Sequence, residues 1–210
     1  MIKLFQRFIQ KVFRDLFGRK KQIKIGLYGP PNSGKTTLAN KICVDWLGEE
    51  LGTSSPIAHE TREVQIKEQV SISSNGKDLS FNLVDTPGIA TKIDYEDFLK
   101  VGMKEAEAKA RAKEATKGVI DAIKWLDDMD VVIVVLDATK DPYSQVNITI
   151  IGNLQARDIP VLIVANKTDL RKADIKKIQS AFPQYEIVGI SAKKGTGVDE
   201  FYEALLGIAG

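Results

Sequence analysis

Residues 29–36, with the sequence GPPNSGKT, have the types and spacing of a phosphate-binding loop, G-x-x-x-x-G-K-T. The loop follows an apolar run at 23–28 and precedes a helix-favouring stretch from Thr36 to Leu47. This order directs backbone N–H groups and the positive end of a helix at one anionic centre. Lys35 can then reach the terminal phosphates, and the Thr36 hydroxyl can hold Mg²⁺. The residues predicted to bind the nucleotide phosphates are Asn32, Ser33, Gly34, Lys35, Thr36 and Thr37.

Three further short motifs each follow a strand-like apolar run. They are DTPG at 85–88, NKTD at 166–169 and SAK at 191–193. Asp85 suits a carboxylate that meets Mg²⁺ through water. Gly88 offers a backbone N–H to a γ-phosphate and has no side chain to obstruct the approach. The strand-like run 131–136 has no recognisable nucleotide motif after it.

The NKTD and SAK motifs indicate which base is bound. Asp169 can accept two hydrogen bonds from guanine, and we expect a buried carboxylate there. Adenine would leave that carboxylate unpaired, at a cost of roughly several kcal/mol, which argues against an ATPase. Asn166 is expected to contact the base edge and tie loops together, the Lys167 stem to lie on the base plane, and the Ala192 N–H to meet the guanine oxygen. The predicted base-binding residues are Asn166, Lys167, Asp169, Ser191, Ala192 and Lys193.

With these motifs in this order, the chain resembles the translation-factor-related GTPases over roughly residues 22–210. Within them it is similar to the branch typified by Era, TrmE and EngA. Its marks are Pro31-Asn32 in the phosphate-binding loop, Thr61-Arg62 before a strand, and Ile89 after DTPG. Ras-like proteins carry a water-orienting glutamine where this chain has Ile89. The resemblance therefore implies GTP turnover that is slow without a partner.

The same resemblance suggests a role for K⁺ at Asn32. In TrmE-like GTPases this side chain helps coordinate a K⁺ ion that takes the place of an arginine finger. The alternative is that Asn32 only stabilises the loop by hydrogen bonding. The length of the loop at 48–62 bears on this choice, because carbonyl groups before Thr61 would complete the K⁺ site.

The periodicity predicts an α/β fold, the G domain of a P-loop GTPase. We expect a mostly parallel six-stranded sheet with one antiparallel edge strand and helices on both faces. Asn75-Gly76 predicts the turn of the antiparallel hairpin. The expected strands are 22–28, 63–72, 79–85, 131–137, 160–165 and 185–190, and the later helices are 143–157, 170–181 and 198–208. No room is expected after the last helix for an RNA-binding domain such as Era-type proteins carry.

Two segments are predicted to respond to the γ-phosphate. The first switch is assigned to 48–62, where Thr61 is expected to complete Mg²⁺ coordination, with Thr53 as the alternative. Lys35, Thr61 and Gly88 are the predicted catalytic residues. The second switch and an extended helix are assigned to 86–128, with a break at Gly118. Small apolar residues recur along this helix at a spacing of three or four. It either lies over the domain as a charged surface helix or docks a partner or a second protomer.

Residues 1–21 predict a cationic amphipathic helix. They contain seven basic residues and Asp15, a net charge of +6, whereas the whole chain carries +2. The helix could fold back on the domain, form a homodimer contact, lie on a membrane surface, or bind RNA or a protein groove.

The composition predicts one cytoplasmic globular domain, with peripheral membrane attachment as an alternative. Apolar residues make up 43% of the chain and charged residues 28%, and no apolar run is long enough to span a membrane. The single cysteine, Cys43, is expected to be buried, and the single histidine, His59, cannot build a metal cluster. The sequence thus predicts a Mg²⁺-dependent GTP hydrolase acting as a switch. A GTP-binding scaffold with little hydrolysis is the alternative.

Overall fold

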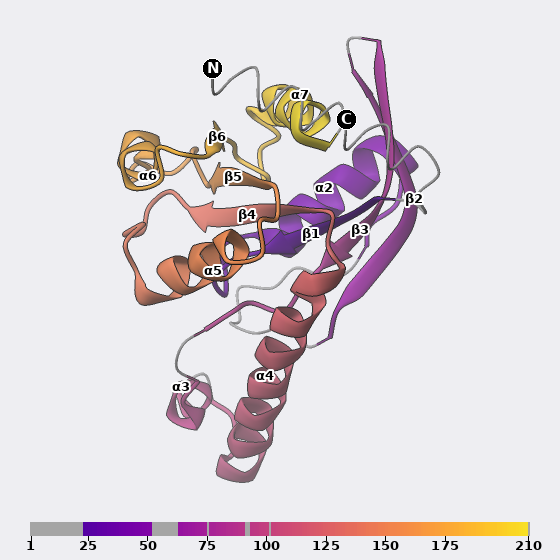
Figure 1. Cartoon of the computed structure of the whole chain (residues 1–210). Helices are drawn as coiled ribbons and strands as arrows, with labels where there is room; N and C mark the ends of the chain where they lie inside the picture. The colour runs from indigo at the N-terminus through magenta and orange to yellow at the C-terminus, as the bar shows by residue number, and fades with distance from the viewer. Residues whose placement is uncertain (1–22, 52–62, 75, 91–92, 101, 210) are drawn as a thin grey trace.

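A six-stranded sheet organises the computed structural model, which describes residues 23–51, 63–74, 76–90, 93–100 and 102–209 (Figure 1). The strand order is β2-β3-β1-β4-β5-β6. Only β2 and β3 pair in antiparallel fashion, and the other neighbours are parallel. The predicted fold class is therefore confirmed. The strands are β1 (Ile23–Tyr28), β2 (Gln65–Ser74), β3 (Lys77–Asp85), β4 (Val131–Asp137), β5 (Val161–Asn166) and β6 (Glu186–Gly189).

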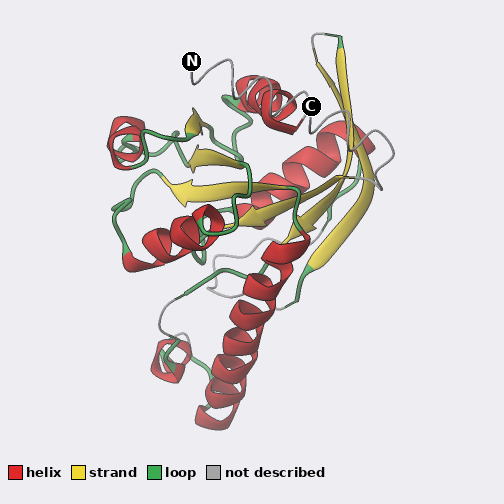
Figure 2. Cartoon of the chain, in the orientation of Figure 1, coloured by secondary structure: helices red, strands yellow, loops and turns green. Residues whose placement is uncertain are grey.

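Helices cover both faces of the sheet, because the central strands are apolar on both sides (Figure 2). In β4, Val131, Ile133 and Val135 join one apolar cluster with α2 and α7, and the residues between them join a second cluster with α5 and α6. Full burial of each such side chain contributes roughly 1.5–3 kcal/mol. The helices are α2 (Lys35–Leu47), α3 (Tyr95–Leu99), α4 (Glu105–Trp125), the short 3₁₀ helix η1 (Leu126–Asp128), α5 (Gln145–Gln155), α6 (Ile175–Ala181) and α7 (Val198–Ala209).

The hairpin that carries the antiparallel edge turns where Asn-Gly predicts it. Ser74 pairs with Lys77, so a two-residue connection joins β2 to β3. Gly76 has a φ of 74°, which suits such a turn. The register shifts between Lys67 and Val70, where Gln69 has a φ of 59° and its N–H donates to the Asn82 side chain at 3.1 Å. This bulge bends the exposed edge strand.

The long second-switch helix breaks at a different place from the one predicted. The sequence analysis puts a break at Gly118, but α4 runs from Glu105 to Trp125 and Gly118 is buried within it. The break instead separates α3 from α4 and contains Gly102, which has a φ of 90° and donates its N–H to the Leu99 carbonyl at 2.9 Å. Burial of Gly118 against neighbouring structure thus outweighs its low helix propensity.

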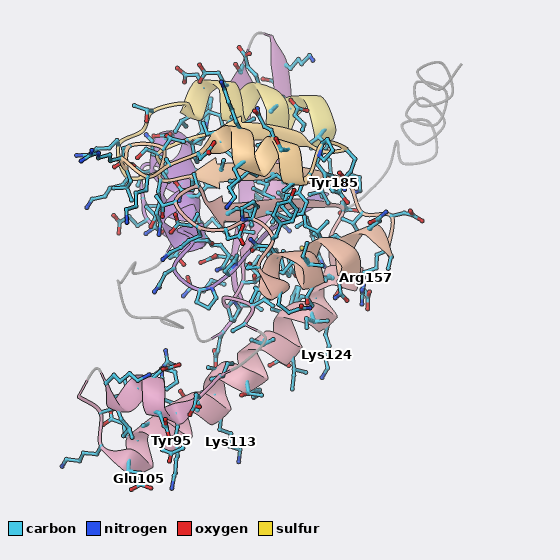
Figure 3. All side chains as sticks on the ribbon, turned by 90° about the vertical axis from the view of Figure 1, so that its left-hand side faces the viewer. Tyr95, Glu105, Lys113, Lys124, Arg157 and Tyr185 are labelled. Carbon is cyan, nitrogen blue, oxygen red and sulfur yellow. The ribbon has the colours of Figure 1, made fainter. Side chains whose placement is uncertain are left out.

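Helix α4 joins the body of the domain at one end and projects from it at the other (Figure 3). At its C-terminal end, Ala122 is buried in the main apolar cluster and its carbonyl accepts a 3.0 Å hydrogen bond from the Tyr28 hydroxyl. At its N-terminal end, Ala108 and Ala115 form a small separate cluster with Phe98 of α3. The predicted stripe of small residues therefore packs on two different partners along its length.

Several predictions fall on residues outside the described ones. They include the N-terminal helix at 1–21 and, within the first switch, Thr53, His59 and Thr61. Cys43 is described and is buried, as predicted. Among the described residues, no helix is long and apolar enough to cross a membrane.

Candidate nucleotide-binding site

The four predicted motifs meet at one edge of the sheet. β1, β3 and β5 end at Tyr28, Asp85 and Asn166, and a motif loop follows or includes each of these ends. Because these strands run parallel, their carboxyl ends lie on the same side, where loops collect (Figure 2). The edge of the sheet thus places the phosphate and base motifs next to each other.

The phosphate-binding loop closes around the buried side chain of Lys35. Its ammonium donates to the carbonyls of Gly29 at 3.2 Å and Pro30 at 2.9 Å. Burial lowers the pKa of Lys35 to about 8, and the neighbouring Asp85 carboxylate opposes this shift. Phosphate groups at the loop would add negative charge and favour the ammonium form. Lys35 is therefore placed to neutralise charge at the N-terminus of α2.

Thr36 and Asp85 form the part of the site that suits a divalent cation. The Thr36 hydroxyl donates to Asp85 Oδ2 at 2.6 Å, and the carboxylate is fully buried. Its other oxygen, Oδ1, is buried without a hydrogen-bond partner among the described residues. A hydroxyl beside a buried carboxylate with an unsatisfied oxygen fits the oxygen ligands that Mg²⁺ prefers, with phosphate oxygens and waters completing its shell. The predicted pair is thus brought together.

The DTPG segment lies directly against the phosphate-binding loop. The Thr86 hydroxyl donates to the Leu27 carbonyl at 2.6 Å, and the Ile89 N–H donates to the Gly29 carbonyl at 3.1 Å. A Cβ atom on Gly88 would lie 2.7 Å from Pro31 Cα, so only glycine fits this approach. The Ile89 side chain is 4% exposed and belongs to the core. This hydrocarbon side chain has no donor or acceptor with which to orient a water molecule.

Asn166 is the hub that joins the phosphate and base loops. Its Nδ2 donates to the Ser33 carbonyl at 2.9 Å, and its Oδ1 accepts from the N–H groups of Lys167 at 2.8 Å and Ala192 at 3.0 Å. A Cβ atom on Gly34 would lie 2.2 Å from Nδ2, which explains the glycine that faces this hub. The expected tie between the loops is present in the structure.

The other base-loop residues differ in how they meet their predicted roles. Asp169 is exposed, so the expectation of a buried carboxylate is wrong. The Ala192 N–H already donates to Asn166, and a guanine oxygen would have to share or replace that acceptor. Ser191 is buried, with its N–H bonded to the Thr196 carbonyl at 2.9 Å, whereas Lys193 is exposed.

Asn32, in the phosphate-binding loop, is also exposed, and its backbone has a left-handed conformation with a φ of 59°.

Asp137 is a contributor that the motif analysis misses. Its Oδ2 accepts a 2.6 Å hydrogen bond from the Lys167 ammonium, which also donates to the Asn32 carbonyl at 2.6 Å. Asp137 ends β4, the strand to which no nucleotide motif is assigned. An acidic residue at the carboxyl end of a central strand is the signal that could have identified it.

Comparison with known proteins identifies the family. Residues 24–167, more than half of the chain, match the family model described as 50S ribosome-binding GTPase. The chain belongs to this family of GTPases. Relatives include GTPase Der of Ruegeria pomeroyi, 27% identical over 198 residues, and tRNA modification GTPase MnmE of Bordetella petrii, 29% identical over 188 residues. Each alignment covers 90% of this chain but only 36% and 34% of the respective relative, so the chain spans about a third of their length.

Solved structures give the same assignment for this GTPase. It superposes on Era in complex with MgGDPNP and a segment of 16S ribosomal RNA with a TM-score of 0.68 and 25% identity, covering 91% of this chain and 58% of that one. A GDP·AlF₄⁻ complex of Era from Aquifex aeolicus gives a TM-score of 0.67, with 25% identity and coverage of 90% and 58%. The prediction of an Era/TrmE/EngA-like P-loop GTPase is confirmed.

Proposed function

We propose that this GTPase is a Mg²⁺-dependent molecular switch that hydrolyses GTP to GDP and phosphate, slowly unless a partner or K⁺ is present. The observation that carries the proposal is the Asn166 hub, which fixes the phosphate-binding loop against both base loops. In this arrangement one nucleotide can touch Lys35 with its phosphates and Asp169 with its base. The matched family and the nucleotide complexes of Era support guanine nucleotide as the ligand.

The proposed roles follow from the positions of the side chains. Lys35 offsets the negative charge on the β and γ phosphates, and the Gly88 backbone approaches the γ-phosphate closely. Mg²⁺ held by Thr36, and by Asp85 through water, would further neutralise the phosphates. Ile89, a buried apolar side chain, stands where Ras-like proteins carry the water-orienting glutamine, and this supports slow intrinsic turnover. Thr61 remains our proposed switch threonine.

Single-turnover hydrolysis of GTP tests the proposal. The full chain is mixed with Mg²⁺ and with less than one equivalent of GTP. Phosphate release is then followed in KCl, in NaCl, and in the presence of RNA or of anionic vesicles. We expect slow hydrolysis that one of these additions accelerates. Removal of Mg²⁺ with a chelator should abolish it. GTP binding without measurable hydrolysis under every condition would favour the rival function, a GTP-dependent scaffold.

We propose that the N-terminal segment supplies the partner contact, because its net charge of +6 favours an anionic surface. RNA is a candidate since the related Era is seen with 16S ribosomal RNA. Deletion of residues 1–21 should abolish binding to anionic vesicles or RNA while GTP affinity stays within a few-fold. Binding that survives the deletion would move the contact to another surface, with α4 the first to test. Aggregation of the truncated chain would instead support the fold-back or homodimer alternatives.

A further inference from the structure

Asp137 lies beside the base loop because β4 and β5 end in register. Asp137 is the register partner of Asn166, and the ladder continues one step further through a 2.9 Å hydrogen bond from the Ala138 N–H to the Asn166 carbonyl. Lys167 is the residue that follows Asn166, so its side chain can reach the Asp137 carboxylate across the sheet edge. Its side chain is 12% exposed, so the charge is largely removed from water.

Both oxygens of the Asp137 carboxylate have fixed partners. Oδ1 accepts from the backbone N–H of Thr139 at 2.9 Å and from its hydroxyl at 2.6 Å. Oδ2 accepts from the Lys167 ammonium at 2.6 Å. Burial raises the pKa of Asp137, but the hydrogen bonds from Lys167 and Thr139 outweigh it, so the pKa lies below its ordinary value. The carboxylate is thus a charged acceptor held in one orientation.

Lys167 is constrained at both ends. Its backbone has a φ of 68°, a left-handed conformation that costs a non-glycine residue roughly 1–3 kcal/mol. Its N–H is bound by Asn166, and its ammonium is held between Asp137 and the Asn32 carbonyl of the phosphate-binding loop. The aliphatic stem therefore bridges the base loop and the phosphate loop. A free lysine stem of this length has many rotamers to lose.

We infer that Asp137 is a positioning residue that holds the stem of Lys167 in place as the surface on which the guanine base lies. The inference rests on the proposed function, because it assigns a role within the guanine site. The ion pair has two effects on nucleotide binding. It orders the lysine before the base arrives, which lowers the entropic cost of binding. It also neutralises the ammonium locally, which leaves Lys35 as the lysine directed to the phosphates.

Asp137→Asn breaks this arrangement while it keeps a side chain of nearly the same size. Among the described residues, three groups donate to the Asp137 side chain: the Thr139 N–H, the Thr139 hydroxyl and the Lys167 ammonium, of which only the hydroxyl can also accept. A carboxylate has two acceptor oxygens for them, whereas an amide has one and turns an NH₂ group toward a donor. Asp137→Asn must therefore release either the Thr139 N–H or the Lys167 ammonium, the two groups that can only donate.

The test is the dissociation rate of fluorescent mant-GDP from the full chain, measured by displacement with excess GDP. We expect Asp137→Asn to speed dissociation by about tenfold, as for loss of a charged hydrogen bond. The dissociation rate should change more than the single-turnover rate of bound GTP. Lys167→Met should have a similar effect, and the double variant should release mant-GDP no faster than Lys167→Met alone, because the two residues act as one unit.

Asp141→Asn is the matched control. Asp141 lies four positions further along and pairs with Lys177 at 3.1 Å, but its side chain is 60% exposed. We expect its release of mant-GDP to equal that of the wild type. If Asp137→Asn folds poorly, Thr139→Val leaves the carboxylate and removes one of its anchors, and it should speed release by a smaller factor. A wild-type release rate in folded Asp137→Asn, or fully additive effects in the double variant, would overturn the inference alone. Failure of the wild type to bind mant-GDP would overturn the proposed function as well.

Discussion

The side chain of Asn166 donates to the backbone carbonyl of Ser33 across 2.9 Å, joining two loops that lie 133 positions apart in the sequence. Both residues are buried, Asn166 at 3% exposure and Ser33 at 0%. Inside the protein a hydrogen bond is stronger than in water, and an unpaired group is costly. The order of the phosphate loop therefore depends on a residue in the base motif.

Asn166→Ala should disrupt nucleotide binding and stability together. It removes the partners of the Ser33 carbonyl, the buried Ala192 N–H and the half-buried Lys167 N–H. A buried group left unsatisfied costs roughly 1–3 kcal/mol. We expect mant-GDP affinity to fall by at least about tenfold, and the melting temperature to fall by about 4–8 °C if about 2 kcal/mol is lost. Fluorescence titration and thermal melting provide the measurements.

The control for this change is Asn153→Ala. Asn153 is a half-buried asparagine on α5 with two hydrogen-bonding neighbours, Thr149 and Arg157, and it belongs to none of the four motifs. Its variant should retain wild-type affinity. Equal losses of affinity in the two variants would show that general destabilisation, rather than the hub, weakens binding.

Gly88→Ala should impair GTP hydrolysis by forcing the DTPG segment away from the phosphate loop. The added Cβ would lie 2.7 Å from Pro31 Cα, a contact with backbone that cannot rotate away. We expect the single-turnover rate to fall by about a hundredfold or more, the loss typical of one oxyanion-type contact. The matched change Gly152→Ala on α5 meets nothing within 4 Å and should leave hydrolysis unaltered. Normal hydrolysis by Gly88→Ala would disprove the close approach of this backbone to the γ-phosphate.

The sequence predicts the parts of this molecule that local patterns encode. Strand alternation, the Asn-Gly turn and the motif loops all rest on residues near in sequence, and the structure contains them at close to the expected bounds. Gly118 and Asp137 show where such reasoning fails. Gly118 stays helical because it is buried, and Asp137 enters the site because β4 and β5 end in register. Both facts are tertiary. Local propensity therefore puts a break at Gly118, and the sequence around Asp137 offers only its place at the end of a strand as a signal.

Asp137→Asn should also reveal itself in the pH dependence of stability. The pKa of Asp137 is lowered in the folded state, so its contribution is present above the ordinary carboxyl pKa of about 4 and is lost as pH falls through the folded value. We expect the wild type to exceed the variant by about 1–2 kcal/mol in unfolding free energy at neutral pH. The difference should shrink below about pH 4. Urea unfolding between these pH values measures it, and a difference that does not change with pH would contradict an ionic role.

Asp169→Asn should exchange guanine preference for xanthine preference. Xanthine carries a carbonyl where guanine carries the exocyclic amine, and an amide can donate to it where a carboxylate would repel it. Competition between mant-GDP and unlabelled xanthosine or guanosine diphosphate measures the exchange. Asp158→Asn, another exposed aspartate at a loop, should keep guanine preference. If Asp169→Asn still prefers guanine, the base site is assigned to the wrong carboxylate.

Hydrolysis should be faster in KCl than in NaCl at equal ionic strength if Asn32 helps to hold K⁺. A monovalent cation there would offset the charge that builds between the β and γ phosphates, as an arginine finger does. Asn32 has a φ of 59°, so Asn32→Gly removes the side chain while the backbone keeps its conformation, which alanine would strain. We expect this variant to bind mant-GDP like the wild type and to hydrolyse GTP equally slowly in both salts. Equal wild-type rates in the two salts would exclude the K⁺ role and direct the search to a group supplied by a partner. A salt difference that survives in Asn32→Gly would place K⁺ elsewhere in the site.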